Sequence, residues 1–166
     1  MSLTVAAVGA VAAALLNLSI APYLAVAGAQ PDFVLICAVV WTVVAGIEGG
    51  LIWAFIGGLM IDFLAPRPLG VTAFTLLICV GGAALVGRAM DRFRLLAPAA
   101  AVALFSAVNA MLFLFVYGAL RGTIPAPDPV SAVLPGALYD GLLAALIGPA
   151  AIAVLARRQD RDRLDW

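Results

Sequence analysis

Four polar side chains stand out because long apolar stretches surround them: Asn17, Asp62, Asn109 and Asp140. A carboxylate in apolar surroundings needs a hydrogen-bonding or charged partner, and such a group is by default a functional hypothesis. For Asp140, the sequence offers Asn109 or an arginine that reaches inward as a partner. The role of Asp140 could be structural pairing, or it could be part of a proton or substrate site. Asp62 lies four residues before Pro66, and we expect loop amides or Arg67 to satisfy it.

The residues that usually carry enzyme chemistry are missing or isolated. The chain has no histidine, and its two cysteines, Cys37 and Cys79, lie inside apolar segments, where a small buried hydrophobe is their ordinary role. The sequence has no nucleophile beside a base, no phosphate-binding loop, no metal-ligand spacing and no haem-ligating histidine. It therefore predicts a non-enzymatic protein without a metal or a cofactor.

The elements that must hold these side chains are apolar helices. Of the 166 residues, 66% are hydrophobic, and runs such as 95–120 and 130–156 exceed what a small soluble core can bury. About 20 apolar residues span the roughly 30 Å hydrocarbon layer of a bilayer. We expect an all-α polytopic membrane protein, with a single transmembrane domain over 1–156 and a short basic and acidic tail over 157–166.

Six transmembrane segments are predicted: 3–27, 32–46, 49–64, 69–87, 95–120 and 130–156. The second and third could instead form one helix over 33–61. That helix would be about 44 Å long and would place the Glu48 carboxylate near mid-membrane. The glycines around Glu48 are typical of a turn, so the sequence favours two short helices that meet there.

Prolines mark the other boundaries. Pro31 opens the second segment, and Asp128 can cap the sixth segment with Pro129 in its first turn. Pro22 and Pro149 lie inside predicted segments and should kink them, because proline removes a helical hydrogen bond.

Arginine sets the expected orientation. All nine basic residues are arginines, and seven of them lie in Arg88–Arg94 and Arg157–Arg163, on one side of a six-helix topology. Because basic loops stay inside, both termini are predicted to be cytoplasmic. A five-helix topology would move only the N-terminus, so charge counting alone does not choose between the two. The short basic patches indicate contact with anionic lipids rather than with nucleic acid.

Small residues recur every four positions, at Gly46, Gly50, Ala54 and Gly58. Such a stripe lets helix backbones approach closely, either inside the bundle or against the transmembrane helix of a partner. We expect the last three to share one helix and the turn to remove Gly46. Trp41 and Trp53 are expected to face lipid or the membrane interface.

A family pattern is carried by residues 30–75. Gln30-Pro31-Asp32 begins an apolar helix, Gly57-Gly58-Leu59-Met60-Ile61-Asp62 follows, and then comes Pro68-Leu69-Gly70-Val71-Thr72-Ala73. This order, with the chain length and the short basic tail, resembles the MreD family of bacterial rod-shape-determining membrane proteins. The motif positions carried over are Pro31, Asp32, Gly58, Asp62, Pro68 and Gly70, and we assign them to shaping the bundle. Glu48 departs from the family, in which basic residues are common at that position.

The resemblance implies a non-enzymatic scaffold of the cell-elongation (Rod) complex in the bacterial inner membrane. Such a protein binds MreC, a bitopic membrane protein, and acts through it with RodA, a penicillin-binding transpeptidase and the actin-like MreB in peptidoglycan synthesis and cell shape. The family is also similar to the six-helix substrate-binding subunits of energy-coupling-factor (ECF) transporters. A solute-binding ECF subunit is therefore the alternative function, although the short, proline-rich outer loops favour the scaffold.

Overall fold

The structure is a computed structural model that describes residues 3–26, 28–65, 68–89, 97–121 and 129–164. These residues form α-helices and a short 3-10 helix, without a strand: α1 (Leu3–Ser19), η1 (Ala21–Leu24), α2 (Phe33–Ala45), α3 (Ile47–Leu64), α4 (Val71–Ala89), α5 (Ala97–Arg121) and α6 (Pro129–Leu164). The prediction of an all-α protein with six main helices is confirmed.

By length and composition, four of the helices can cross a membrane: α3, α4, α5 and α6 each contain an apolar window of at least 18 residues. The other two, α1 and α2, are apolar but shorter. With 13 residues, α2 rises only about 20 Å and does not cross the hydrocarbon layer by itself. The chain is therefore a multi-pass membrane protein in which short helices pack among full-length ones.

A tight turn at Gly46 separates α2 from α3. Gly46 has φ +104°, a conformation that glycine adopts without strain, and it ends α2 while it begins α3. Across the turn, the backbone of Gly50 lies against the Thr42 side chain and that of Gly57 lies against Val34. Because the paired residue numbers fall along α2 as they rise along α3, the two helices are antiparallel. Two separate helices, the short α2 and the longer α3, rather than one continuous helix, occupy this region.

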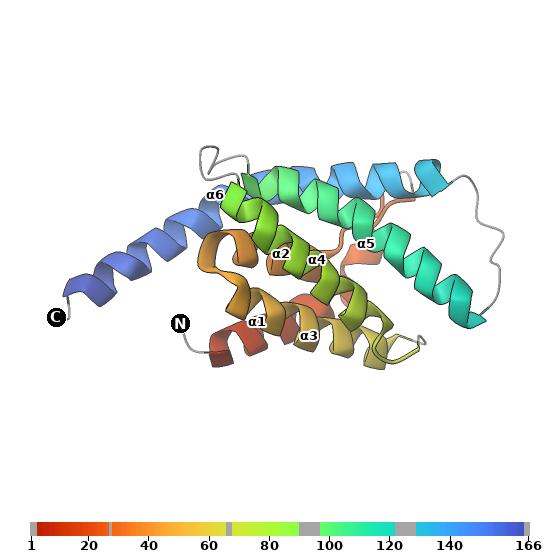
Figure 1. Cartoon of the computed structure of the whole chain (residues 1–166), viewed down its shortest axis with the longest axis horizontal. Coiled ribbons are helices and arrows are strands. Elements are labelled where there is room, and N and C mark those ends of the chain that lie inside the picture. The colour runs from red at the N-terminus through yellow and green to blue at the C-terminus, as the bar shows by residue number, and fades with distance from the viewer. Residues whose placement is uncertain (1–2, 27, 66–67, 90–96, 122–128, 165–166) are drawn as a thin grey trace.

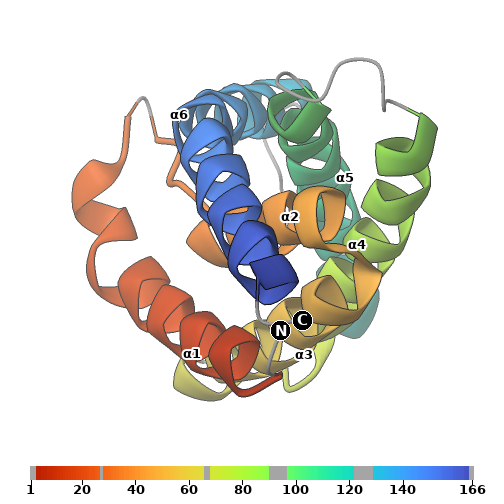
Figure 2. The same ribbon diagram turned by 90° about the vertical axis from the view of Figure 1, so that its left-hand side faces the viewer.

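The centre of the bundle is α2. It contacts α1, α3, α4, α5 and α6, and Figure 2 shows it surrounded by these helices. Seven of its thirteen residues are buried, among them Leu35, Ile36 and Val39, which are fully inaccessible. A helix that is apolar on all sides suits such a position.

The two ends of the bundle differ. The first turn of α1 and the last turns of α6 lie at the same end as the Gly46 turn, whereas α3 ends and α4 begins at the opposite end (Figure 1). Both chain ends therefore lie on one side of the bundle, as an even number of crossings requires.

Two predicted helix boundaries are wrong. The first helix ends at Ser19 instead of continuing to residue 27, and Pro22 lies in η1 rather than kinking α1. Proline disfavours helical conformation in the residue before it and cannot donate a backbone hydrogen bond. The last helix continues to Leu164 instead of ending at 156, so residues 157–164 extend α6 (Figure 1). Pro149 does lie inside α6, as does Pro135. Pro129 begins α6, and Asp128 lies outside the described residues.

The small-residue stripe on α3 faces the interior of the bundle. Gly50 packs on α2, Ala54 is fully buried, and a Cβ on Gly58 would lie 2.5 Å from the Cα of Ala73 in α4. The neighbouring helices of the same chain thus occupy the stripe.

Trp53 does not face lipid or the membrane interface, so that expectation is wrong for this residue. It is only 7% exposed, because its indole lies over Gly9 of α1 and beside Trp41, with ring centroids 5.7 Å apart. A face of small residues on α1 makes room for this ring. Ala6, Ala10, Ala13 and Ala14 on that face are all buried.

Candidate functional site

Asp62, in the last turn of α3, closes the start of α4. Its carboxylate is buried and accepts hydrogen bonds from the backbone N–H groups of Gly70 (2.9 Å), Thr72 (3.0 Å) and Ala73 (3.4 Å). Gly70 has φ +91°, which turns the chain so that these N–H groups face the carboxylate. The first N–H groups of a helix have no partner inside the helix, and Asp62 supplies one from another element. Arg67, the alternative partner, lies outside the described residues.

Asp140 of α6 plays a similar part at the start of α2. One of its carboxylate oxygens accepts the backbone N–H of Asp32 (2.9 Å), and the other accepts the hydroxyl of Ser106 on α5 (2.5 Å). Asp140 is 2% exposed. The predicted partner, Asn109, is one helical turn away from the true one, Ser106, so that prediction is wrong. The carboxylate ties together α2, α5 and α6.

The start of α2 has two further caps. The Asp32 side chain accepts the backbone N–H of Leu35 (3.1 Å), an ordinary N-cap, while the Asn17 carbonyl oxygen accepts the N–H of Phe33 (2.9 Å). Pro31, just before the cap, is fully buried. Asn17 thereby connects the end of α1 with the start of α2.

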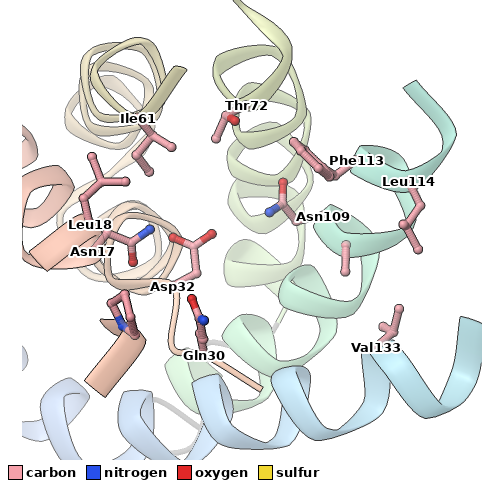
Figure 3. A pocket seen from close by; sticks show the side chains of 12 residues that line it. Asn17, Leu18, Gln30, Asp32, Ile61, Thr72, Asn109, Phe113, Leu114 and Val133 are labelled. Carbon is pink, nitrogen blue, oxygen red and sulfur yellow. The ribbon is translucent and has the colours of Figure 1, made fainter. Parts of the chain in front are cut away.

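These polar groups border a cavity of about 390 Å³ at the end of the bundle opposite the chain termini. The residues that line it come from α1, η1, α3, α4, α5, α6 and the connection before α2, and Figure 3 shows their side chains around it. Its lining is Asn17, Leu18, Pro22, Gln30, Asp32, Ile61, Thr72, Asn109, Ala110, Phe113, Leu114 and Val133. Five of these side chains are polar and seven are apolar.

Two side-chain oxygens on the cavity wall have no hydrogen-bond partner although they are inaccessible to solvent. They are Oγ1 of Thr72 and Oδ1 of Asn109. Such groups are rare in folded proteins, because a buried polar atom without a partner costs about 1–3 kcal/mol. Thr72 belongs to α4 and Asn109 to α5, two helices that pack against each other, and Figure 3 shows the two side chains on the same side of the cavity. The cavity that both residues line is the candidate binding site.

The structure brings together most of the residues that the sequence singled out. Asn17, Asp32 and Asn109 line the cavity. Asp140 does not line it but accepts the backbone N–H of Asp32, and Asp62 accepts the backbone N–H of Thr72. Gly50, Ala54 and Gly58 do not line it.

Sequence reasoning missed Ser106, and it quoted Thr72 and Gln30 only as parts of the family pattern, without a role. Ser106 could have been found, because it lies three residues before Asn109 and so shares its face of a helix.

Among the described residues, no group of three or more histidine, cysteine or acidic side chains could hold a metal ion. Cys37 is half-buried and Cys79 is buried, and both are free thiols. The Sγ atom of Cys79 lies 3.5 Å from the backbone carbonyl of Phe105, a contact between α4 and α5. Both cysteines thus lie in the packing between helices, away from the cavity.

Comparison with known families gives one match. A family model for the rod shape-determining protein MreD matches residues 2–124. The chain belongs to the MreD family. The match covers most of the chain and includes Asn17, Asp62 and Asn109. It also includes all six motif positions, Pro31, Asp32, Gly58, Asp62, Pro68 and Gly70. No curated protein and no solved structure matches the chain significantly.

Membership of the MreD family gives the motif positions a structural context. Gly58, Asp62 and Gly70 form the contact between α3 and α4, where Pro68 accepts the N–H of Val71 through its carbonyl oxygen. Pro31 and Asp32 form the start of α2. Members of the MreD family determine rod shape, and this chain is a multi-pass membrane protein of that family.

Proposed function

We propose that this protein is a non-enzymatic scaffold of the bacterial cell-elongation complex, which binds MreC in the inner membrane and so helps to control peptidoglycan synthesis. RodA, the penicillin-binding transpeptidase and MreB are reached indirectly, through MreC. The observation that carries the proposal is the MreD family match over residues 2–124.

The packing of the bundle limits where a partner helix can bind. The small-residue stripe of α3 is covered by α2 and α4, so a partner cannot reach it without displacing them. The outer face of α6 is open, since Leu134, Leu138, Leu142 and Leu146 recur every four residues and are all more than half exposed. This leucine stripe offers continuous apolar contact along a transmembrane helix. We therefore place the MreC contact on helices α4 to α6.

Co-purification in mild detergent tests the scaffold proposal. The tagged protein should retain an MreC-like bitopic protein, and replacing Leu138 and Leu142 together with alanine should reduce the amount retained. A control pair on the open face of α1, Val8→Ala and Leu15→Ala, should have no such effect. If no MreC-like protein is retained with the unaltered chain, the proposal fails.

A solute-binding subunit of an ECF-type transporter is the second candidate, and the cavity is the observation that favours it. The same co-purification separates the two functions, because a transporter subunit should retain an ATPase module instead. Localisation to the inner membrane with both termini in the cytoplasm is part of the first proposal and is consistent with both.

A further inference from the structure

We infer that the cavity at the end of the bundle binds an uncharged group rich in hydroxyls, of the size of a single hexose, either free or as the headgroup of a glycolipid. This goes beyond the proposed scaffold function, because it assigns a ligand to the isolated protein and requires no partner protein. The inference rests on which polar groups of the cavity wall are already engaged within the protein and which are left over.

The charge on the cavity wall is already engaged within the protein. Among the described residues that line the cavity, Asp32 carries the only charged side chain. Its carboxylate accepts the backbone N–H of Leu35, and Asp32 has a further interaction besides. The wall therefore does not offer a free carboxylate to a cationic ligand.

The helix ends beside the cavity have internal acceptors as well. Helix N-termini ordinarily attract phosphate or carboxylate, and both α2 and α4 begin near the cavity. The backbone N–H of Phe33 donates to Asn17, however, and that of Thr72 donates to Asp62. Because these N–H groups are occupied and no described lining side chain is cationic, an anion would bury its charge without a partner there.

Three primary amides are left over, and they come from three parts of the chain. Asn17 belongs to α1, Gln30 to the connection before α2 and Asn109 to α5, and Figure 3 shows their side chains around the cavity. The side-chain oxygen of Asn17 accepts the N–H of Phe33, and that of Asn109 is inaccessible to solvent. Both residues thus present amide N–H groups to a ligand. Gln30 is exposed, and its side chain makes no hydrogen bond to another described residue, so it can turn to donate or to accept.

Hydroxyl groups match this set of amides. A hydroxyl oxygen can accept hydrogen bonds from Asn17 and Asn109, while its hydrogen can be donated to the carbonyl oxygen of Gln30. An ammonium group cannot accept hydrogen bonds, and an ether oxygen cannot donate one. A neutral group with several hydroxyls is therefore the ligand class that uses all three amides.

The size and position of the cavity suit one sugar ring. A volume of about 390 Å³ corresponds to about a dozen water-sized groups at ~30 Å³ each, and a hexose has about a dozen non-hydrogen atoms. The cavity lies among helix ends, with the exposed residues Pro22 and Gln30 at its edge and apolar side chains such as Phe113 and Leu114 in its wall. A headgroup can thus enter while its apolar tail remains in the bilayer. A free sugar offers the same chemistry.

The test compares amphiphiles that share an octyl tail, on the full chain purified in a detergent without a sugar headgroup, with binding followed by native mass spectrometry. Octyl glucoside should bind at least about tenfold more tightly than octyltrimethylammonium or octyl sulfate. It should also bind more tightly than octyl tetraethylene glycol methyl ether, which is neutral but whose oxygens only accept. If a charged amphiphile or the methyl ether binds as tightly as the glucoside, the inference is wrong.

Variants locate the binding. Asn109→Leu and Gln30→Leu each remove one amide and should weaken glucoside binding about three- to tenfold, the effect of one hydrogen bond. Neither side chain makes a hydrogen bond to another described residue, so neither replacement breaks a bond inside the bundle. Met111→Ala is the matched control on α5, because Met111 is 55% exposed and does not line the cavity. Its glucoside binding should equal that of the wild type.

Methyl glucoside, which lacks the tail, distinguishes the two sources. If it displaces octyl glucoside at similar concentrations, the cavity recognises a free sugar; if it does not, a glycolipid is the ligand. Both outcomes support hydroxyl recognition. Equal binding by wild type, Asn109→Leu and Gln30→Leu would place the glucoside elsewhere on the surface and overturn the assignment. Should either variant fail to fold, the comparison of headgroups on the wild-type chain still decides.

Discussion

At the scale of single residues, two aspartates complete helices to which they do not belong. Asp62 of α3 accepts N–H groups from the start of α4, and Asp140 of α6 accepts the N–H of Asp32 at the start of α2. A membrane supplies no water to these groups, so an N–H without a protein partner is more costly there than at an aqueous surface. Each carboxylate also lies at the positive end of the helix dipole that it caps. These aspartates are therefore part of the packing of the bundle.

Replacing Asp62 with alanine should lower the folded yield and the apparent melting temperature in detergent. The N–H groups of Gly70 and Thr72 would lose their acceptor, at a cost of about 1–3 kcal/mol. Asp62→Asn keeps a carbonyl oxygen at the same position and should lose less. A chain with Asp62→Ala that is fully abundant and thermally unchanged, yet inactive in a cell-shape assay, would instead show a direct role in an interaction.

Ser106 and Asp140 should behave as a coupled pair. Ser106→Ala removes the hydroxyl donor and Asp140→Ala removes its acceptor, and each should lower the apparent melting temperature. Because both disrupt one hydrogen bond, the double variant should be less destabilised than the sum of the two, by about 1–3 kcal/mol for a hydrogen bond to a charged group. Simple additivity would mean that the two side chains do not interact in the folded protein.

At the scale of helices, glycine sets the distances between neighbours. Gly58 brings α3 onto the backbone of α4, and Gly82 makes room for Phe105 of α5 in the same way. Where a glycine faces open space instead, as Gly81 does, it has no such role. The position of each glycine on its helix therefore decides whether a larger side chain is tolerated.

A comparison of Gly58→Ala with Gly81→Ala tests this. The added Cβ of Gly58→Ala would meet the backbone of Ala73 at 2.5 Å, so the helices must separate and the apparent melting temperature should fall. Gly58→Leu should have a larger effect. Gly81→Ala meets nothing within 4 Å and should be neutral or raise the melting temperature, because alanine favours a helix by about 1 kcal/mol over glycine. Equal effects at both positions would contradict the role of Gly58 in helix packing.

Glycines and prolines in the sequence were enough to locate several helices. The third and fourth segments, predicted at 49–64 and 69–87, correspond to α3 (Ile47–Leu64) and α4 (Val71–Ala89), because glycines and prolines border them. The early end of α1 was missed because its apolar composition continues beyond the last helical residue. Hydropathy indicates whether a segment can lie in an apolar environment, but it does not indicate where the helix in that segment ends.

The cavity could not be predicted in the same way. Its polar residues were visible one at a time, but their meeting depends on how α5 and α6 are placed against α2. The bond between Ser106 and Asp140 joins residues 34 positions apart, and that between Asp32 and Asp140 joins residues 108 apart. Such contacts are set by the rotation and register of packed helices, which hydrophobic periodicity specifies weakly in a chain that is apolar on most faces.

At the scale of the whole molecule, the ends of the bundle have different characters. The chain termini lie together at one end and the cavity lies at the other. The six-helix topology expected from the sequence puts seven of the nine arginines on the side of the termini, so that side is the one expected to remain in the cytoplasm. The cavity would then open towards the periplasmic leaflet.

Reporter fusions at each terminus test this orientation. Green fluorescent protein should fluoresce and alkaline phosphatase should be inactive at both ends, because the former folds in the cytoplasm and the latter requires export. An alkaline phosphatase that is active at the N-terminus alone would leave an odd number of crossings and contradict the arrangement in Figure 1.

The central position of α2 also orders the assembly of the protein during synthesis. The backbone N–H of Asp32 donates to Asp140, which the ribosome adds 108 residues later. At about 5–20 residues per second, this hydrogen bond can form only roughly 5 to 20 seconds after Asp32 is made. Until then, the start of a helix too short to cross the bilayer lacks one of its acceptors. The nascent bundle is therefore incomplete at its core until its last helix enters the membrane. A chain that ends before α6 therefore leaves α2 without the helix that completes its first turn and covers one of its sides.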